Sequence, residues 1–145
     1  MVLVVGLFLL IHSQNQSAKS LSACGFRSDR AVSINSQKIE AEVADSNQTR
    51  EQGLSGRPCI GRDEGMLFVF DRPSFYYFWM KNMKFPIDIV WISADHRVVG
   101  LKTNALPSSY PQKYGNKGNS AQYVLEIAAG RAASLHVSPG TNVNF

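Results

Sequence analysis

Hydrophobic positions along the chain mostly follow the two-residue period of β-strands. Apolar and polar residues alternate over residues 39–44, and residues 31–35 precede them across a short polar turn, so the two stretches predict a strand pair. Residues 66–70, 75–80 and 87–92 consist almost entirely of large apolar or aromatic residues. Runs of this kind predict strands that are covered on both faces.

Helix signals are few and short. Ser46 is a plausible N-cap before good helix formers, and Gly53 is a natural stop, so one helix is predicted over residues 46–52. A second short helix is predicted within residues 128–135.

The remaining apolar stretches predict further strands. Residues 97–101 complete a hairpin, and residues 123–127 and 142–145 predict the last two strands. Residues 103–121 contain Pro, Gly, Ser and Asn without a period, which predicts a long surface loop. About seven short strands and two short helices predict a mostly β fold of β-rich α+β type, as a compact single-domain barrel or sandwich.

The N-terminal residues have a different pattern. Residues 1–11 are apolar and uncharged, and the next nine residues are polar. Eleven residues are about half of the ~20 that a membrane-spanning helix needs, so this stretch resembles a signal-peptide core, with a buried strand as the alternative. We therefore expect a signal-like segment and linker over residues 1–30, one β-rich domain over residues 31–145, and an extracytoplasmic location with membrane association through the N-terminus.

The chain has two cysteines, Cys24 and Cys59, and their pattern leaves three hypotheses open. In an oxidising compartment two cysteines commonly form a disulfide. Residues 21–25 also resemble the processing box of a bacterial lipoprotein, in which the cysteine becomes lipidated. Free thiols are the third alternative.

Composition and charge narrow the range of functions. A length of 145 residues and 16.0 kDa fits one ordinary domain, with 44% hydrophobic and 18% charged residues. A net charge of +4 is well below that of a dedicated nucleic-acid binder. The basic excess lies in residues 97–145, which predicts a weakly basic face suited to anionic lipid or cell-wall polymer.

Three carboxylates, Glu64, Asp88 and Glu126, are next to apolar strand residues, where an ionised carboxylate needs a partner or shifts its pKa. One hypothesis is that they form structural ion pairs. The other is a carbohydrate or peptidoglycan hydrolase in which Glu64 or Glu126 acts with Asp88. The basic residues proposed as ion-pair partners are Arg57, Lys81 and Arg131.

Aromatic residues are concentrated in one segment: nine of the fifteen Phe, Tyr and Trp residues lie between Phe68 and Trp91. They predict either a single aromatic core or one wall of a ligand-binding cleft. In the second case the wall would consist of Tyr77, Trp79 and Trp91, with Lys81, Asn82 and Asp88 as polar anchors.

Three of the four methionines, Met66, Met80 and Met83, fall in or near this segment. Thioethers are soft ligands for Cu(I), which makes weak metal binding an alternative function. Methionines beside strands are also ordinary core residues, and there is no His or Cys close by.

Several motifs in one order resemble a known family. They are Gly53-Leu54-Ser55-Gly56-Arg57, Asp63-Glu64-Gly65-Met66 with the apolar residues that follow, Phe78-Trp79-Met80-Lys81-Asn82-Met83, Pro86-Ile87-Asp88-Ile89 and Tyr123-Val124-Leu125-Glu126-Ile127. Over about residues 34–145 the chain resembles domain-of-unknown-function family 192. The resemblance implies a small, β-rich, often exported bacterial or archaeal protein with no established activity.

The preferred hypothesis is a monomeric envelope domain that binds a small molecule, a glycan or an envelope protein, with no cofactor and no nucleic-acid partner. Whether it is also an enzyme stays open at this stage. The expected binding residues are Arg57, Glu64, Trp79, Lys81, Asn82, Asp88, Tyr123 and Glu126.

Overall fold

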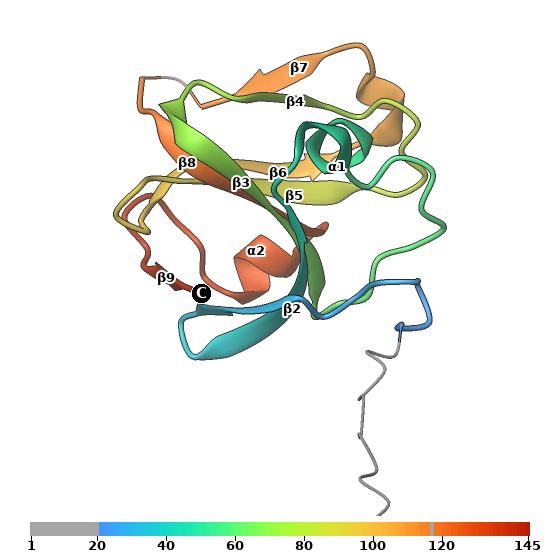
Figure 1. Ribbon diagram of the computed structural model, residues 1–145, viewed down its shortest axis with the longest axis horizontal. Coiled ribbons are helices and arrows are strands. Elements are labelled where there is room, and N and C mark those ends of the chain that lie inside the picture. The colour runs from blue at the N-terminus through green and yellow to red at the C-terminus, as the bar shows by residue number, and fades with distance from the viewer. Residues whose placement is uncertain (1–20, 117) are drawn as a thin grey trace, which may run out of the picture.

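A curled seven-stranded sheet forms the body of the molecule (Figure 1). The computed structural model describes residues 21–116 and 118–145. The strand order is β6-β5-β8-β3-β2-β1-β9, and only β2 and β3 pair in parallel. The strands are β1 (Arg30–Ile34), β2 (Gln37–Ala44), β3 (Glu64–Ser74), β5 (Ile87–Ile92), β6 (Val98–Ala105), β8 (Ala121–Ala128) and β9 (Val143–Asn144).

The two outer ends of the sheet approach each other, because an isolated antiparallel bridge joins Arg97, just before β6, to Asn142, just before β9. The sheet is curled into roughly half of a barrel, and the expected mostly β fold is confirmed. Helix α2 (Arg131–Ser134) lies on the concave side of the curl (Figure 1).

A second, two-stranded sheet lies over the other side of the main sheet (Figure 1). It pairs β4 (Tyr77–Trp79) with β7 (Lys113–Gly115). Helix α1 (Asn47–Gln52) and the 3-10 turn η1 (Pro107–Ser109) are the other helical elements of the described residues.

Apolar residues form two buried clusters, one on each face of the main sheet, because alternate strand residues point to opposite faces. In β8, Leu125 and Ile127 belong to the cluster next to α2, and Val124 belongs to the cluster beneath β4. The second cluster also contains Phe68 and Trp91, which are almost fully buried.

Three expected elements differ from the structure. Strand β3 continues through Ser74, beyond residues 66–70. The expected loop over residues 103–121 contains the end of β6, η1 and β7. Residues 75–80 are not covered on both faces, since the Tyr77 and Trp79 side chains are 66% and 43% exposed, whereas Met80 is buried.

The two cysteines form a disulfide, Cys24–Cys59, so pairing is confirmed among the three alternatives. The bond fastens the segment before β1 to the loop before β3. The signal-like residues 1–11 lie outside the described residues. Across residues 21–116 and 118–145, no helix has both the length and the apolar character to cross a membrane.

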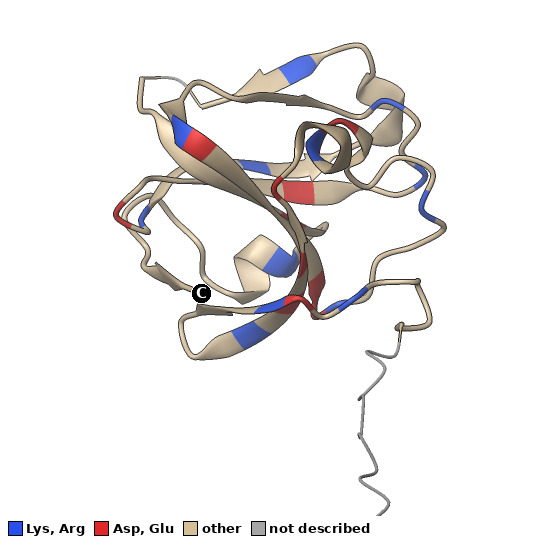
Figure 2. Ribbon diagram, in the orientation of Figure 1, with Lys and Arg blue, Asp and Glu red and all other residues tan. Residues whose placement is uncertain are grey.

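Basic positions are distributed over several elements of the ribbon (Figure 2). Arg131 is only 6% exposed and pairs with Asp63 at 2.7 Å. Lys102 lies over the Tyr114 ring and Lys113 over the Trp79 ring. Folding therefore distributes the C-terminal charge over different surroundings.

Candidate functional site

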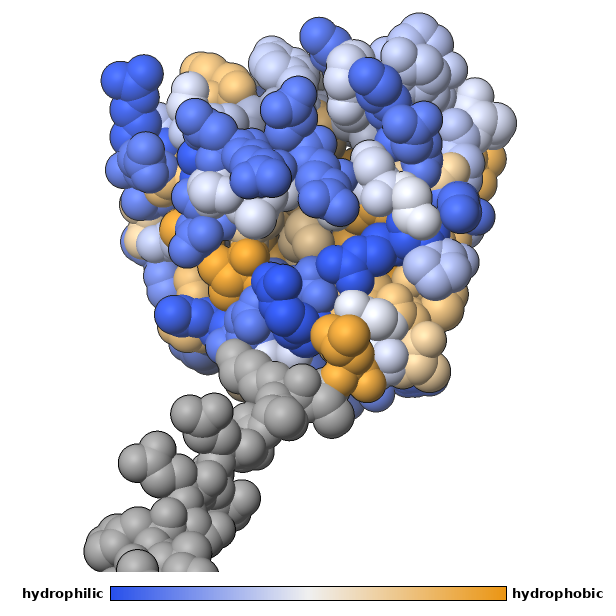
Figure 3. Space-filling model, turned by 45° about the vertical axis from the view of Figure 1, so that its right-hand side comes forward, coloured by the Kyte–Doolittle hydropathy of each residue, from blue (hydrophilic) through white to orange (hydrophobic). Residues whose placement is uncertain are grey.

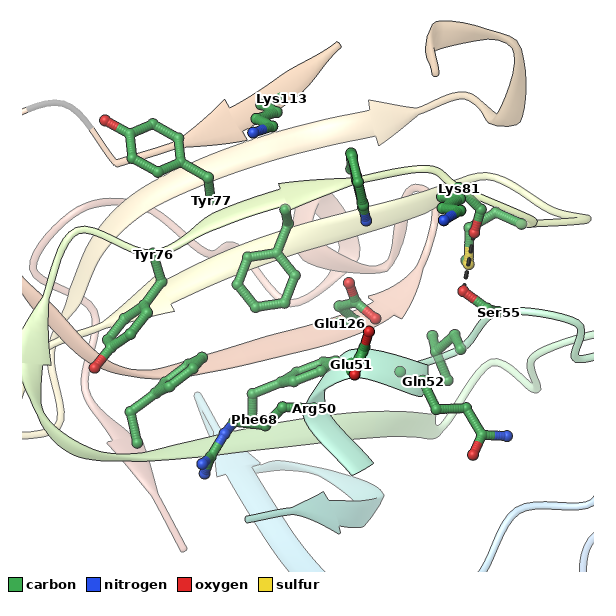
Figure 4. A pocket seen from close by; sticks show the side chains of 16 residues that line it. Arg50, Glu51, Gln52, Ser55, Phe68, Tyr76, Tyr77, Lys81, Lys113 and Glu126 are labelled. Carbon is green, nitrogen blue, oxygen red and sulfur yellow. Dashed lines mark hydrogen bonds between the residues drawn. The ribbon is translucent and has the colours of Figure 1, made fainter. Parts of the chain in front are cut away.

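A cavity of about 420 Å³ lies between α1, β4 and the main sheet (Figure 4). Apolar surface shows between hydrophilic side chains on the face turned forward in Figure 3. The last three residues of α1 and all of β4 contribute to the cavity walls. The lining residues are Arg50, Glu51, Gln52, Gly53, Leu54, Ser55, Phe68, Phe70, Tyr76, Tyr77, Phe78, Trp79, Lys81, Met83, Lys113 and Glu126.

Glu126 provides a carboxyl group deep in this cavity. In β8 it is in register with Met66 of β3 on one side and Ile89 of β5 on the other, and both neighbours belong to an apolar cluster. Glu126 is only 5% exposed, and its carboxyl group points into the cavity (Figure 4). Within the described part of the chain, its side chain forms no hydrogen bond or ion pair.

Burial raises the pKa of the Glu126 carboxyl group to about 8. The cause is loss of hydration, which disfavours the charged form when no partner replaces the water. The carboxyl group is thus mostly protonated at pH 7. In this form it donates one hydrogen bond through its O–H and accepts others.

Aromatic rings form the walls beside Glu126. Phe78 meets Phe68 edge-on with centroids 4.9 Å apart, and it also meets the buried Trp91 at 6.2 Å. Phe70 and Tyr76 stack with centroids 3.5 Å apart. These contacts hold the rings in place, so the cavity wall is built before any ligand arrives.

Helix α1 is fixed at the mouth of the cavity by polar contacts. Ser46 and Thr49 form a reciprocal capping box at its start. The Arg50 guanidinium donates to the carbonyl oxygens of Asp45 and Val69, which ties the helix to β3. At its other end, the Ser55 hydroxyl donates to the Lys81 carbonyl at 2.9 Å.

Two lysines and exposed rings form the rim. Lys81 Nζ and Lys113 Nζ lie 5.5 and 5.6 Å from the centroid of the Trp79 ring. Trp79 also contacts Tyr110 edge-on at 5.6 Å. Neither lysine forms a salt bridge within residues 21–116 and 118–145. The rim is therefore positively charged above a mostly neutral acid.

The structure brings three of the expected binding residues, Trp79, Lys81 and Glu126, together in this cavity. Asn82 lines an adjoining hollow of about 300 Å³ that also contains Lys81. The other four expected residues, Arg57, Glu64, Asp88 and Tyr123, lie outside the cavity.

Asp88 lies on the opposite face of the sheet from Glu126. Its register partner in β8 is Ile127, and it is fully buried. Its carboxylate accepts from the backbone N–H groups of Asn104 at 2.8 Å and Ala132 at 2.9 Å. Asp88 thus joins β6 to α2, and the structure does not bring it together with Glu126 as a hydrolytic pair.

Arg57 and Glu64 belong to the region around the disulfide. Arg57 donates to the Glu42 carboxylate at 2.6 Å and to the Gly25 carbonyl at 2.6 Å. Glu64 accepts from the Gly61 N–H at 2.7 Å, beside a separate hollow of about 410 Å³.

Tyr123 packs away from the cavity, against the rings of His96 and Phe145, with centroid distances of 5.2 and 4.9 Å.

The ion pairs expected for Glu64, Asp88 and Glu126 do not form. In the part of the chain that the structure describes, Arg57 pairs with Glu42 and Arg131 with Asp63 instead. Backbone N–H groups satisfy Glu64 and Asp88, which leaves Glu126 as the carboxylate without a partner among these three.

The three methionines of the copper alternative pack in the apolar cluster beneath β4. Met66 and Met80 are buried, and Met83 is partly buried against the same cluster and lines the cavity. No group of three or more His, Cys, Asp or Glu residues is arranged to hold a metal ion in the described ranges.

Several cavity residues had no recognisable signal in the sequence. Glu51 and Gln52 lie on a six-residue helix with no buried residue, so no apolar stripe shows which neighbour it contacts. Lys113 comes from the stretch expected to be a loop, and only the pairing of β7 with β4 places it beside Trp79.

The fold and cavity define a small, mostly β domain with an aromatic pocket around a buried acid. The chain belongs to the DUF192 family, described as an uncharacterised ACR, whose family model matches residues 30–145. The resemblance expected from the motifs is thereby confirmed. No curated protein matches the chain.

Two solved structures are similar to this one. A Novosphingobium aromaticivorans protein of unknown function has a TM-score of 0.77 and 29% identity, over 90% of this chain and 94% of its own. A Sinorhizobium meliloti protein, described as a candidate transcription regulator, has a TM-score of 0.72 and 32% identity, over 79% of this chain and 89% of its own.

Proposed function

We propose that this domain binds a saccharide in the aromatic cavity, with Glu126 as the hydrogen-bonding anchor. The observation that carries the proposal is the Glu126 carboxyl group, which is 5% exposed, lacks a partner among the described residues and points into a cavity open to solvent. Its register neighbours Met66 and Ile89 are apolar, and an acid is costly to ionise beside them, so folding alone gives no reason to keep it there.

The cavity chemistry favours a sugar over a purely apolar or a cationic ligand. A protonated carboxyl group donates to and accepts from hydroxyl groups, and Gln52 and Ser55 add polar groups nearby. The faces of Phe78 and Trp79 suit the apolar face of a sugar ring. Lys81 and Lys113 at the rim repel cations.

The disulfide supports a location where such ligands occur. Disulfides persist in oxidising compartments and are rare in the cytosol. Together with the signal-like residues 1–11, this supports an extracytoplasmic protein that meets glycans of the cell envelope.

The proposal is tested by NMR titration of the full chain with N,N′-diacetylchitobiose and with hexagalacturonate, a neutral and an acidic probe. We expect at least one probe to shift signals of Phe78, Ser55 and Glu126 with a saturating curve. In Glu126→Met, an apolar residue of similar length, we expect about tenfold weaker binding from the lost hydrogen bond. Absence of cavity shifts with both probes contradicts the proposal.

A matched control separates the site from general effects on the fold. Glu64→Met removes a carboxylate from the same sheet but outside the cavity, so we expect its affinity for either probe to equal that of the wild type. Equal weakening by Glu64→Met and Glu126→Met contradicts an anchor at Glu126.

A hydrolase is the second candidate, because Glu51 and Glu126 both line the cavity. A protonated Glu126 would act as the general acid, and the exposed Glu51 as the base or nucleophile. Mass spectrometry of each probe after incubation tests it. Cleavage that Glu51→Gln abolishes establishes hydrolysis, and intact probe with full binding excludes it for these substrates.

A further inference from the structure

The rim of the cavity continues onto an exposed row of aromatic rings on β4. Tyr77 and Trp79 are two residues apart, so both point to the outer face of the small sheet. They are 66% and 43% exposed, whereas Phe78 between them packs inward on Phe68. A row of exposed rings has no role in the core and offers a stacking surface.

Gly115 positions the first of these rings. It is in register with Tyr77 across the two strands. A Cβ atom at Gly115 would lie only 2.5 Å from the Cδ1 and Cε1 atoms of Tyr77. The Tyr77 ring therefore packs against a bare backbone, and any larger residue at position 115 must displace it.

Positive charge surrounds the second ring. Lys81 and Lys113 come from different elements, yet both place Nζ within 5.6 Å of the Trp79 centroid. Both lysines also line the cavity, and neither is neutralised by an ion pair in the described part of the chain. A ligand that leaves the cavity past Trp79 thus meets two cations.

We propose that the ligand is an acidic glycan, whose sugar rings stack on Trp79 and Tyr77 while its carboxylates pair with Lys81 and Lys113. The inference rests on the proposed saccharide function and names the class of glycan, a polymer of uronic-acid type. One sugar occupies the cavity at Glu126, and the chain continues along β4. Charge complementarity and the aligned rings select this occupant.

Aromatic rings beside lysines also suit single-stranded nucleic acid. One observation favours the glycan. The disulfide supports a compartment in which nucleic acid is not the ordinary ligand.

The test compares calorimetric affinities for hexagalacturonate and for its methyl ester, which has the same backbone without negative charge. We expect the acidic form to bind at least about fivefold more tightly, a modest factor because both pairs are exposed. The difference shrinks as salt rises, since exposed charges are screened. In the double variant Lys81→Gln/Lys113→Gln, both forms bind with the affinity of the ester.

Two further variants sharpen the comparison. Lys84→Gln removes the same charge from an exposed lysine that does not line the cavity. We expect this variant to prefer hexagalacturonate over the methyl ester as strongly as the wild type does. Gly115→Ala displaces the Tyr77 ring, and we expect this variant to bind hexagalacturonate and its methyl ester more weakly by the same factor.

Equal affinity for both forms in the wild type, with cavity signals still shifting, overturns the acidic glycan and leaves saccharide binding intact. Tighter binding of hexathymidylate than of hexagalacturonate overturns it in favour of nucleic acid. Loss of the acidic preference in Lys84→Gln as well shows a general charge effect and also overturns it. Absence of binding by either form contradicts the saccharide function itself.

Discussion

Glu42 and Glu126 are both in register with Met66, on the two sides of β3, and therefore lie on the same face of the sheet. They are 2% and 5% exposed. Glu42 accepts from the Arg57 guanidinium at 2.6 Å and from the Arg27 N–H at 2.8 Å, whereas Glu126 has no partner among the described residues. The two glutamates are buried to a similar extent, but only Glu42 is paired. Glu42 is therefore a structural carboxylate, whereas Glu126 is available to a ligand.

Glu126 makes stability fall as pH rises. Its pKa is about 8 in the folded protein against an ordinary value of 4.5, so between these two values only the unfolded state loses the proton. Stability then decreases by up to about 1.4 kcal/mol per pH unit, and the effect is complete above pH 8. Glu126→Gln, which stays neutral, is expected to match the wild type near pH 5 and to be several kcal/mol more stable at pH 9. Urea unfolding at both pH values measures this, and equal stability at pH 9 contradicts it.

Arg57 is expected to matter for stability because it neutralises Glu42. The Glu42 side chain is only 3% exposed, and in Arg57→Ala its carboxylate keeps only the Arg27 N–H as a partner. This loss costs about 2 kcal/mol or more. The double variant Arg57→Met/Glu42→Met removes both charges and is expected to regain most of that loss. A thermodynamic cycle from urea unfolding measures the coupling, and independent, additive effects count against the pair.

The disulfide is expected to stabilise the fold by restricting the unfolded chain. Cys24 and Cys59 are 35 residues apart, a loop for which the loss of chain entropy corresponds to about 3 to 4 kcal/mol. Cys24→Ser/Cys59→Ser is expected to unfold at lower urea concentration by this amount. Mass measurement without reductant checks the bond by a loss of two hydrogen atoms, and an unmodified dithiol in the protein purified without reductant contradicts it.

Asp88 and Trp79 were expected in one binding surface, and their variants are now expected to behave differently. Asp88→Asn replaces a fully buried carboxylate that accepts from two backbone N–H groups, which costs about 1 to 3 kcal/mol. Trp79→Ala truncates a 43% exposed ring, so its melting temperature changes little while binding of hexagalacturonate weakens. Binding curves and melting curves recorded on both variants distinguish a structural role from a binding role. Unfolding of Trp79→Ala at a lower temperature than the wild type identifies the ring as structural.

Local patterns were sufficient for much of the fold. The run over residues 87–92 corresponds to β5, and Ser46 caps α1 as its sequence position predicts. The alternation over residues 75–80 correctly divides the aromatic residues between two faces. It did not show that one face stays exposed, because covering a face depends on elements far away in the chain.

The candidate site depends on long-range pairing, which explains what the sequence did and did not show. A glutamate between Leu125 and Ile127 is an anomaly that can be read locally, and Glu126 was found in this way. Its cavity is built from α1, β4 and β7, and no local pattern places these next to β8. The same limit applies to Asp88, whose partners in β6 and α2 lie 16 and 44 residues away.

The most direct test of the binding account is the ¹³C NMR signal of the Glu126 side-chain carboxyl carbon, assigned by comparison with Glu126→Gln. The account predicts titration near pH 8 in the free protein, and a saturating shift of this signal when hexagalacturonate is added at pH 7. A signal that titrates near the ordinary pKa of glutamate, or that does not move while the sugar binds elsewhere, contradicts the account.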